Sequence, residues 1–243
     1  MLDLPVDVVT RQGLLDRVAE LVDAGGRATV AYLNVHVANV AFRDADLAGF
    51  LEGVDLCYCD GSGVRLGARL LGERLPERMT GADWIWDFAA RAEGCWRVAW
   101  VGGEPGVART AAAELEARCP ALEIRAWHGF HSPAETPAVL AEINAWAPQV
   151  VLVGMGTPVQ ERWVARWRPD LDAPVVWCLG ATADFVSGKT SRGPQVLYDN
   201  HMEWLARLLT EPRRLWRRYL VGNPWFFARV LARVPAQQRR RHR

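Results

Sequence analysis

Several features that would assign a chain to a familiar class are missing from this sequence. No window of about 18 uninterrupted apolar residues occurs among its 243 residues, so we expect no transmembrane helix. The N-terminal residues show no basic segment followed by an apolar run, so we expect no secretory signal and a protein that stays in the cytoplasm. The five cysteines form no spaced framework, which argues against structural disulfides and against a zinc site.

The motifs of common nucleotide-binding folds are also missing. Gly154 and Gly156 stand in a glycine turn, but no third glycine follows at the spacing of the dinucleotide-binding fingerprint, and the P-loop pattern is absent. A dehydrogenase would need that fingerprint and a ribose-binding acid about 20 residues later, so this class is not favoured. Asp44-Ala45-Asp46 has the letters of the metal-holding Asp-x-Asp of many sugar transferases, but it follows no buried strand. We therefore expect no metal ion and no cofactor.

What is present fits an α/β protein with a real core. Half of the residues are apolar and 23% are charged, which is ordinary for a globular chain. Strand-like apolar runs alternate with helix-like stretches at residues 11–22, 107–118 and 137–146. The runs cover residues 28–33, 56–59, 97–101, 123–127, 150–153 and 175–179. This alternation predicts a mostly parallel, doubly wound, Rossmann-like sheet with flanking helices.

Charge is divided unevenly along the chain. The net charge is +1, yet residues 203–243 contain eleven arginines and two acidic residues, so this segment carries about +9 and the rest about −8. Such segregation predicts that the C-terminal segment meets an anionic partner, either a membrane surface, a diphosphate or a nucleic acid. Tryptophans and prolines interrupt the basic segment, so we do not expect nucleic acid.

The C-terminal segment also predicts helices. Arginines alternate there with bulky apolar residues over 203–234, and Pro212 and Pro224 suit first-turn positions. Arginine with tryptophan on the apolar side is typical of a helix lying in a membrane interface. The alternative is an ordinary amphipathic helix that packs on the core or on another subunit. We predict an α/β domain with an inter-lobe cleft over residues 1–200 and an Arg- and Trp-rich helical appendage over residues 201–243.

Glycine turns follow four of the predicted strands. They contain Gly61 with Gly63, Gly102 with Gly103, Gly154 with Gly156, and Gly180. Ligands of doubly wound folds bind beyond the carboxyl ends of the strands, and glycine lets backbone N–H groups approach an oxyanion. The set of turns predicts one pocket for a phosphate-rich ligand, although glycine after a strand is also common turn chemistry.

Five blocks of residues, read in order, resemble the WecG/TagA/CpsF glycosyltransferases, family 26 of the sugar transferases. They are Asn34, Cys59-Asp60-Gly61-Ser62-Gly63-Val64, Arg78-Met79-Thr80-Gly81-Ala82-Asp83, Val153-Gly154-Met155-Gly156-Thr157-Pro158-Val159-Gln160-Glu161, and Ala183-Asp184-Phe185-Val186-Ser187-Gly188 leading to Arg192-Gly193-Pro194. Residues 203–208 and 211–214 complete the pattern. The likeness runs from about Pro5 to Val230, and the order and spacing of the blocks make it specific.

The resemblance implies an inverting, metal-independent transferase that uses a UDP-sugar. Its acceptors are saccharides linked to polyprenyl diphosphate, in the synthesis of teichoic acid, enterobacterial common antigen or exopolysaccharide. It also implies a two-lobed α/β fold whose C-terminal appendage docks on the inner face of the cell membrane, with self-association while the appendage is unengaged. Relatives transfer N-acetylmannosamine, its uronic acid, glucose or glucuronic acid, and the residues here do not separate these sugars.

The same resemblance assigns roles to residues of this chain. Asp60 is expected to be the catalytic base, with an Asp that caps the following helix or turn as the alternative. Arg78, Gln160 and Asn34 are expected beside it in the active site. Arg207, Arg214 and Arg217 match appendage arginines that close over the diphosphate, for which a planar guanidinium is well suited. The predicted donor site consists of Gly102, Gly103, Phe130, Gly154, Gly156, Pro158, Gln160, Glu161, Gly180 and Asp184.

Two of these expectations have open alternatives. Phe130 is expected to flank the uracil ring, with an ordinary core aromatic as the alternative. His128 and His131 flank Phe130, and a histidine base is possible there, but Asp60 is preferred.

The chain also departs from the family at Tyr32, where a threonine is usual. A catalytically inactive relative is disfavoured because Asp60, Arg78, Gln160 and Asp184 are all retained.

Overall fold

The computed structural model describes residues 1–190 and 203–241. Its strands are β1 (Ala28–Leu33), β2 (Leu56–Cys59), β3 (Arg97–Gly102), β4 (Glu123–Trp127), β5 (Val150–Gly154) and β6 (Val175–Cys178). They form one sheet in the order β2-β1-β6-β5-β3-β4, and every neighbouring pair is parallel. The Rossmann-like class predicted from the sequence is confirmed, and the two sides of the molecule share one continuous sheet.

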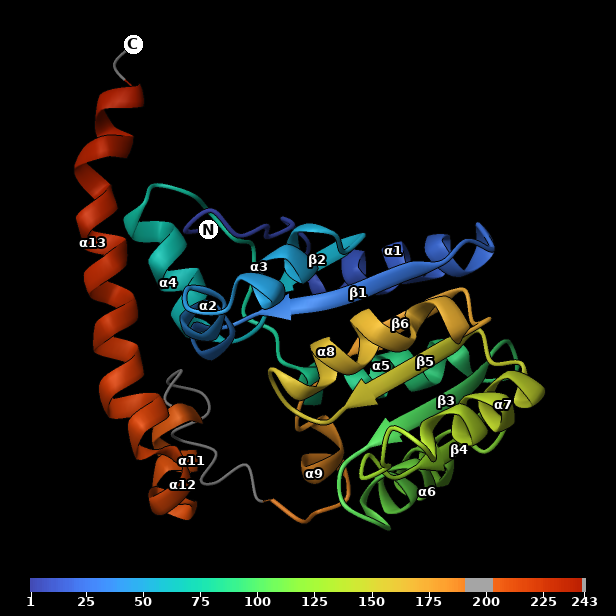
Figure 1. Cartoon of the computed structure of the whole chain (residues 1–243). Coiled ribbons are helices and arrows are strands. Elements are labelled where there is room, and N and C mark those ends of the chain that lie inside the picture. The colour runs from blue at the N-terminus through green and yellow to red at the C-terminus, as the bar shows by residue number, and fades with distance from the viewer. Residues whose placement is uncertain (191–202, 242–243) are drawn as a thin grey trace.

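Helices connect these strands and cover both faces of the sheet. Before and between the strands lie α1 (Arg11–Asp23), α2 (Val35–Ala41), α3 (Ala45–Glu52), α4 (Ser62–Leu70), α5 (Gly81–Ala92), α6 (Val107–Arg118), α7 (Thr136–Trp146) and α8 (Val159–Trp167) with the turn η1 (Arg168–Asp170), and α9 (Thr182–Val186) follows β6. Helices α3, α7 and α8 lie on one face and α1, α5 and α6 on the other (Figure 1). The predicted helices at 11–22, 107–118 and 137–146 correspond to α1, α6 and α7.

The core explains why the strands are almost entirely apolar. Every residue of β1, β2, β5 and β6 is buried, because helices cover both sides of the sheet. On the α5 face, the rings of Trp84 and Trp177 stack with their centroids 4.0 Å apart. Tyr58 and Phe88 meet the Trp177 ring edge-on at 6.2 and 5.6 Å. Aromatic pairs of this geometry stabilise a core beyond the area that they bury.

The C-terminal helices lie beyond the carboxyl ends of the strands (Figure 1). They are α11 (Glu203–Thr210), α12 (Pro212–Trp216), a π-helical turn η2 (Arg217–Val221) and α13 (Gly222–Arg241). Helix α13 packs against α2 and α4, which themselves begin at the ends of β1 and β2. The predicted C-terminal helical segment is therefore present, and it stands over the strand ends where ligands of such folds bind.

A cationic and aromatic cluster fixes α13 to α2. The Arg229 guanidinium lies 4.1 Å from the ring centroid of Trp225 and 4.5 Å from that of Phe42. Asn39 of α2 donates its amide N–H to the carbonyl oxygen of Gly222 at 2.8 Å and accepts a hydrogen bond from Arg229. Cation–π contacts of this kind and a hydrogen bond to a helix terminus hold the two helices in one register.

Some predictions fall outside the described residues or concern side chains that turn out to be inert. The Arg192-Gly193-Pro194 block and the last two residues lie outside the described residues. The cysteines are free thiols, as expected, and Cys95 is exposed while the other four are buried. Burial raises the pKa of Cys57 and of Cys59 to about 12, so these thiols stay protonated.

Candidate functional site

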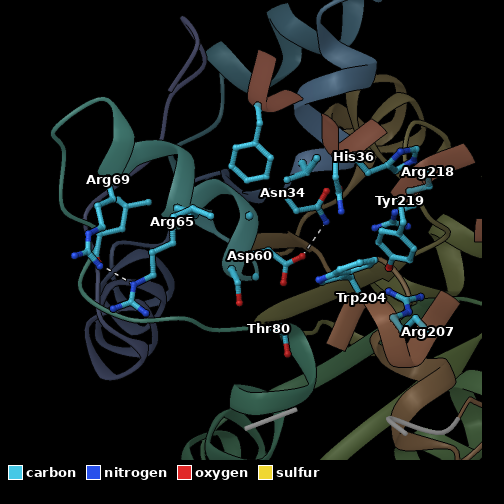
Figure 2. Close-up of a pocket in the computed structure, with 18 of the residues that line it drawn as sticks. Asn34, His36, Asp60, Arg65, Arg69, Thr80, Trp204, Arg207, Arg218 and Tyr219 are labelled. Atoms are coloured by element: carbon cyan, nitrogen blue, oxygen red, sulfur yellow. Dashed lines mark hydrogen bonds between the residues drawn. The ribbon is translucent and has the colours of Figure 1, made fainter. Parts of the chain in front are cut away.

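A cavity of about 930 Å³ opens at the carboxyl ends of β1 and β2 (Figure 2). Its floor is formed by the first residues after the two strands, one wall by α4 and the loop that follows it, and the other wall by the C-terminal helices. The lining residues include Asn34, His36, Asp60, Arg65, Leu66, Arg69, Glu73, Arg74, Thr80, Trp204, Arg207, Arg218 and Tyr219. Most of them belong to segments far apart in the sequence.

Two predicted catalytic residues meet on the floor of the cavity. Leu33 and Cys59 are register partners in β1 and β2, so Asn34 and Asp60, which follow them, emerge side by side. The Asn34 side-chain oxygen caps α2 by accepting the Val37 N–H at 3.0 Å. Its NH₂ group is thereby directed at Asp60 and donates to Oδ2 at 2.9 Å. The pairing positions the Asp60 carboxylate in the cavity.

Asp60 is not a helix-capping residue. The position before α4 is occupied by Gly61, which has a φ of 81° and no capping side chain. Gly61 donates its N–H to the Met79 carbonyl at 2.8 Å, so the turn is held by backbone bonds. The N-cap position of α4 thus belongs to Gly61 and not to Asp60.

Gln160 and Glu161 lie in the interior and not on the cavity lining. Both side chains are at most 2% exposed. Gln160 donates to the Tyr32 hydroxyl at 3.2 Å and to Glu161 Oε1 at 2.8 Å, and its oxygen accepts the Gly180 N–H at 2.9 Å. Burial raises the pKa of Glu161. The network ties the ends of β1 and β6 to the start of α8.

The network also accounts for the departure at Tyr32. Its ring is buried at the end of β1, and its hydroxyl reaches Gln160 and lies 3.5 Å from the Thr157 hydroxyl. Burial raises the pKa of this phenol well above its ordinary value, so the hydroxyl stays protonated. Tyr32 thus connects the end of β1 to Gln160 at the start of α8 by a hydrogen bond.

The glycines after β3, β5 and β6 are packed against one another. A Cβ atom on Gly102 would lie 2.3 Å from the Gly154 carbonyl oxygen, and one on Gly154 would lie 2.8 Å from that of Gly180. A Cβ on Gly180 would come within 2.5 Å of the Tyr32 hydroxyl. Close backbone approach therefore favours glycine at positions 102 and 154, and at position 180 the Tyr32 hydroxyl and a backbone φ of 61° favour it, independently of any ligand.

Arg78 lies beside the cavity and not on its lining. Its guanidinium forms an ion pair with Asp83 at 3.6 Å, and both side chains are largely buried. Asp83 in turn accepts hydrogen bonds from the N–H and hydroxyl of Thr80, each at 3.0 Å. Thr80 lines the cavity. The pair therefore fixes the segment that passes next to Asp60.

The three predicted appendage arginines have different surroundings. Arg207 lines the cavity, whereas Arg214 is paired with Glu211 at 2.6 Å and Arg217 lies over the Trp216 ring at 5.2 Å. Arg218, which the sequence did not single out, lines the cavity instead. Arg217 and Arg218 are the first two residues of the π-helical turn, and only the second of them lines the cavity.

Arg207 and Arg218 each bring a guanidinium group to the cavity lining. The Nε atoms of both are buried, and neither has a hydrogen-bond partner among the described residues. Buried donors without partners are costly, and a phosphate oxygen would satisfy them with charge-assisted hydrogen bonds. Arg207 also lies 5.0 Å from the Phe185 ring centroid, which brings it to the α9 side of the cavity.

His36 is a second lining residue that sequence reasoning missed. It stands two residues after Asn34 in the first turn of α2, next to Arg218 (Figure 2). Burial, aided by the Arg218 charge, lowers its pKa to about 4, while a hydrogen bond to the Thr157 backbone acts in the opposite direction. The imidazole is therefore neutral at pH 7. Its position after Asn34 was the only signal in the sequence.

The predicted uracil-side residues lie away from this cavity. Phe130 is 68% exposed, which excludes the alternative of a core aromatic. Lys189, the single lysine of the chain, contacts Asp184 at 3.7 Å and Glu104 at 2.8 Å. His128 and His131 stack at 4.1 Å beside Phe130 and do not line the cavity. A second polar surface thus lies at the ends of β3 and β4.

The part of the chain that the structure describes presents neither a metal-binding cluster nor a membrane-spanning helix. Within residues 1–190 and 203–241, no group of three or more His, Cys, Asp or Glu side chains is placed to hold a metal ion. Asp44, from the Asp-x-Asp letters, caps α3 by accepting the Leu47 N–H at 3.1 Å. Among the described helices, none combines the length and apolarity needed to cross a bilayer.

Comparison with known proteins identifies the family of the chain. A sequence model described as the glycosyl transferase WecG/TagA/CpsF family matches residues 1–241, nearly the whole chain. This family indicates sugar transfer in the synthesis of cell-surface polysaccharides. The protein therefore belongs to the WecG/TagA/CpsF family of glycosyltransferases.

Proposed function

We propose that the protein is an inverting, metal-independent hexosyltransferase. It moves a sugar from a UDP-sugar to a saccharide linked to polyprenyl diphosphate, at the cytoplasmic face of the membrane. The observation that carries this proposal is the Asp60 carboxylate, held by Asn34 in a cavity whose walls bear arginines. A base and a set of cations for a departing diphosphate are the two requirements of such a reaction.

The transfer step assigns one task to each group. Asp60 accepts the proton of the acceptor hydroxyl as its oxygen attacks the anomeric carbon from the face opposite UDP. The new carbon–oxygen bond forms while the bond to the β-phosphate breaks, and the electron pair leaves with the diphosphate. A single displacement of this kind inverts the configuration at that carbon. Arg207 and Arg218 neutralise the charge that develops on UDP, which is the role that a metal ion has in other transferases.

The donor site is proposed at the ends of β3, β5 and β6. The predicted residues there that are not buried in the interior include Gly103, Gly156, Pro158 and Asp184, with the exposed Phe130 ring available to stack on a base. The Asp184 carboxylate could accept the imide N–H of uracil, a contact that would require Lys189 to shift from its present position. UDP would then reach across the sheet edge toward Arg207.

Membrane docking is proposed for the C-terminal helices. Leu209, Leu220 and Leu231 are exposed apolar residues on arginine-rich helices, and Leu209 is 69% exposed. Such a surface binds an anionic interface through its apolar side chains and its charge. Leu209→Gln with Leu220→Gln should weaken binding to phosphatidylglycerol vesicles, while the matched control Val8→Gln, at an exposed site in the N-terminal segment, should not. Equal binding by all three proteins would contradict the docking proposal.

The experiment that tests the enzymatic proposal is calorimetry with UDP, NAD and ADP, without divalent metal. Selective binding of UDP that Asp184→Ala weakens would support a UDP-sugar donor. Equal binding of NAD, or no binding of UDP, would contradict the proposal. A positive result leads to assays of UDP-sugars with prenyl-diphosphate-linked acceptors, in which the configuration of the product tests inversion.

A further inference from the structure

The cavity has two cationic walls, and only one of them is used by the mechanism above. The C-terminal wall carries Arg207 and Arg218. The opposite wall carries Arg65 and Arg69 of α4 and Arg74 of the loop that follows, together with Glu73. Asp60 lies between the two walls, with Arg65 and Arg69 on one side and Arg207 and Arg218 on the other (Figure 2).

The α4 arginines lead away from the reacting centre. Arg65 and Arg69 are four residues apart, so they lie on one face of the helix. Helix α4 begins at Ser62, immediately beyond Asp60 and Gly61. At about 1.5 Å per residue, Arg69 lies about 10 Å along the helix axis from Ser62. The wall is therefore a row of cations that starts near the base and extends outward.

These three arginines are not used by the fold as ion pairs. The Arg65 Nε–H donates to the Leu75 carbonyl at 3.3 Å, which leaves the rest of the guanidinium facing the cavity. Among the described residues, no carboxylate lies within 4.0 Å of Arg65, Arg69 or Arg74. The wall has more positive than negative charge even with Glu73 included, so it favours an anionic ligand.

Two diphosphates take part in the proposed reaction, and they differ in their distance from the reacting carbon. The diphosphate of UDP is bonded directly to that carbon, so its cations must lie next to the centre. The diphosphate of the acceptor is separated from the attacking hydroxyl by at least one sugar ring. Arg207 adjoins Phe185 and hence the proposed donor side, whereas α4 lies across the cavity from it. The C-terminal wall is therefore suited to the diphosphate of UDP, and the α4 wall to the more distant diphosphate of the acceptor.

The same helix also offers an apolar surface. Leu66 and Leu70 follow Arg65 and Arg69 by one residue each, so they form a parallel row on the next face of α4. Their exposed fractions are 50% and 41%, and Leu66 lines the cavity. A row of cations beside a row of exposed leucines is complementary to a diphosphate that continues into a prenyl chain.

We infer that the α4 wall, formed by Arg65, Arg69 and Arg74 with Leu66 and Leu70, is the binding site for the prenyl diphosphate of the acceptor. This inference rests on the proposed function, and it deepens it by assigning the two diphosphates to opposite walls. Helix α4 then contributes the acceptor specificity, and the C-terminal helices contribute to the departure of UDP.

The test is binding of farnesyl diphosphate, below its critical micelle concentration, and of UDP, both measured by calorimetry on the full-length protein. Arg65→Gln with Arg69→Gln should weaken farnesyl diphosphate binding about tenfold or more, because charge-assisted hydrogen bonds are lost, and should change UDP binding less than about twofold. Arg218→Gln should do the reverse. Arg109→Gln with Arg166→Gln, two exposed arginines of α6 and α8, removes the same charge elsewhere and should change neither.

Every outcome decides between the assignments. Unchanged farnesyl diphosphate binding in the α4 variant, or no binding by the unmodified protein, overturns the inference. If the α4 variant loses as much affinity for UDP as for farnesyl diphosphate, the α4 arginines bind the donor, and the inference is again overturned. If the unmodified protein does not bind UDP, the proposed function alone is contradicted, because binding of farnesyl diphosphate is measured independently. Arg69→Gln, at an exposed site, repeats the test if the double variant is unstable.

A second binding experiment distinguishes a site for prenyl diphosphate from a site for inorganic diphosphate. Leu66→Gln should weaken binding of farnesyl diphosphate about threefold and leave inorganic diphosphate unaffected, because only the prenyl chain contacts the leucine row. Equal affinities of the unmodified protein for the two ligands would assign the wall to free diphosphate and overturn its assignment to a prenyl acceptor.

Discussion

The two halves of the sheet edge are built differently, although every strand there is parallel and ends in a turn. At the ends of β1 and β2, Asn34 and Asp60 project into an open cavity. At the ends of β3, β5 and β6, glycine backbones pack against one another, and Gln160 is sealed beneath them. The first half exposes polar side chains to the cavity, whereas the second half consists of closely packed backbone.

This difference separates two kinds of sensitivity to mutation. Polar groups that face a cavity contribute little to folding, so their replacement should change the reaction and leave stability nearly unaltered. Close-packed backbone and buried hydrogen bonds contribute to stability, so replacements there should unfold the protein before they reveal a catalytic effect. The following predictions test this contrast, from the largest expected effect to the smallest.

Gly102→Ala should destabilise the fold by about 4 kcal/mol, because the new Cβ would meet the Gly154 carbonyl and the φ of 145° is strained for alanine. Urea unfolding measures the change. Gly49→Ala is the matched control: this glycine lies in α3 with open space around it, and alanine should stabilise the helix by up to about 1 kcal/mol. Equal losses at both sites would show that the packed glycines have no special role.

Asp60→Asn should lower turnover by at least about a hundredfold, because the amide cannot accept the proton, while the midpoint of unfolding and UDP binding stay nearly constant. Asp46→Asn, at an exposed site in α3, is the control and should have no effect. Asn34→Ala should have a smaller effect that is not additive with Asp60→Asn, since the two side chains act as a pair. Joint loss of UDP binding and turnover would contradict the role as base.

Gln160→Leu should cost about 2 kcal/mol of stability, because the Gly180 N–H and the Tyr32 hydroxyl lose a buried partner. Thermal and urea unfolding provide the measurement. Gln12→Leu removes an exposed glutamine that bonds only to Asp16 among the described residues, and we expect a change within about 0.5 kcal/mol. A Gln160 variant of normal stability but low turnover would move this residue to the catalytic half.

His36 should make stability depend on pH. Its pKa falls from 6.5 in the unfolded chain to about 4 in the fold, so the unfolded state binds more protons between these values. Stability should therefore decrease as pH falls from about 6.5 to 4 and level off below, by roughly 1–2 kcal/mol since part of the ring meets solvent. His36→Gln should flatten this part of the curve. Parallel curves for the two proteins would contradict the assignment.

Arg218→Gln should weaken UDP binding about tenfold, whereas Arg217→Gln should change it less than about twofold, because Arg218 lines the cavity and Arg217 does not. Calorimetry with UDP distinguishes the two variants, and each serves as the control for the other. The opposite ranking would mean that the helical register changes when the donor binds.

Much of the fold could be predicted because strands covered on both faces must be apolar. The runs at 28–33, 56–59 and 123–127 coincide with β1, β2 and β4, and the remaining strands differ by one residue at an end. Several helices between the strands were missed, among them the twelve-residue α5, and in the shortest, α2 and α9, five to seven residues carry too little periodicity to reveal a helix.

The site was predictable only in part. Asp60 and Asn34 could be found because they directly follow strands, and strand neighbours bring their ends together. Arg218 could not be found, because which of two adjacent arginines faces the cavity depends on how the C-terminal helices pack over the strand ends. The inward position of Gln160 was equally hidden, since it depends on the hydroxyl of Tyr32, which is 128 residues away.

The sequence by itself determined the α/β class, the basic and aromatic C-terminal segment, and the polar residues at the strand ends, because burial, charge and turn chemistry are properties of short stretches. The tertiary structure alone decided which of these residues share a cavity, which glycines are sealed, and which arginines face Asp60 from opposite sides. Such contacts join segments distant along the chain, and their geometry follows from how the helices pack over the sheet edge.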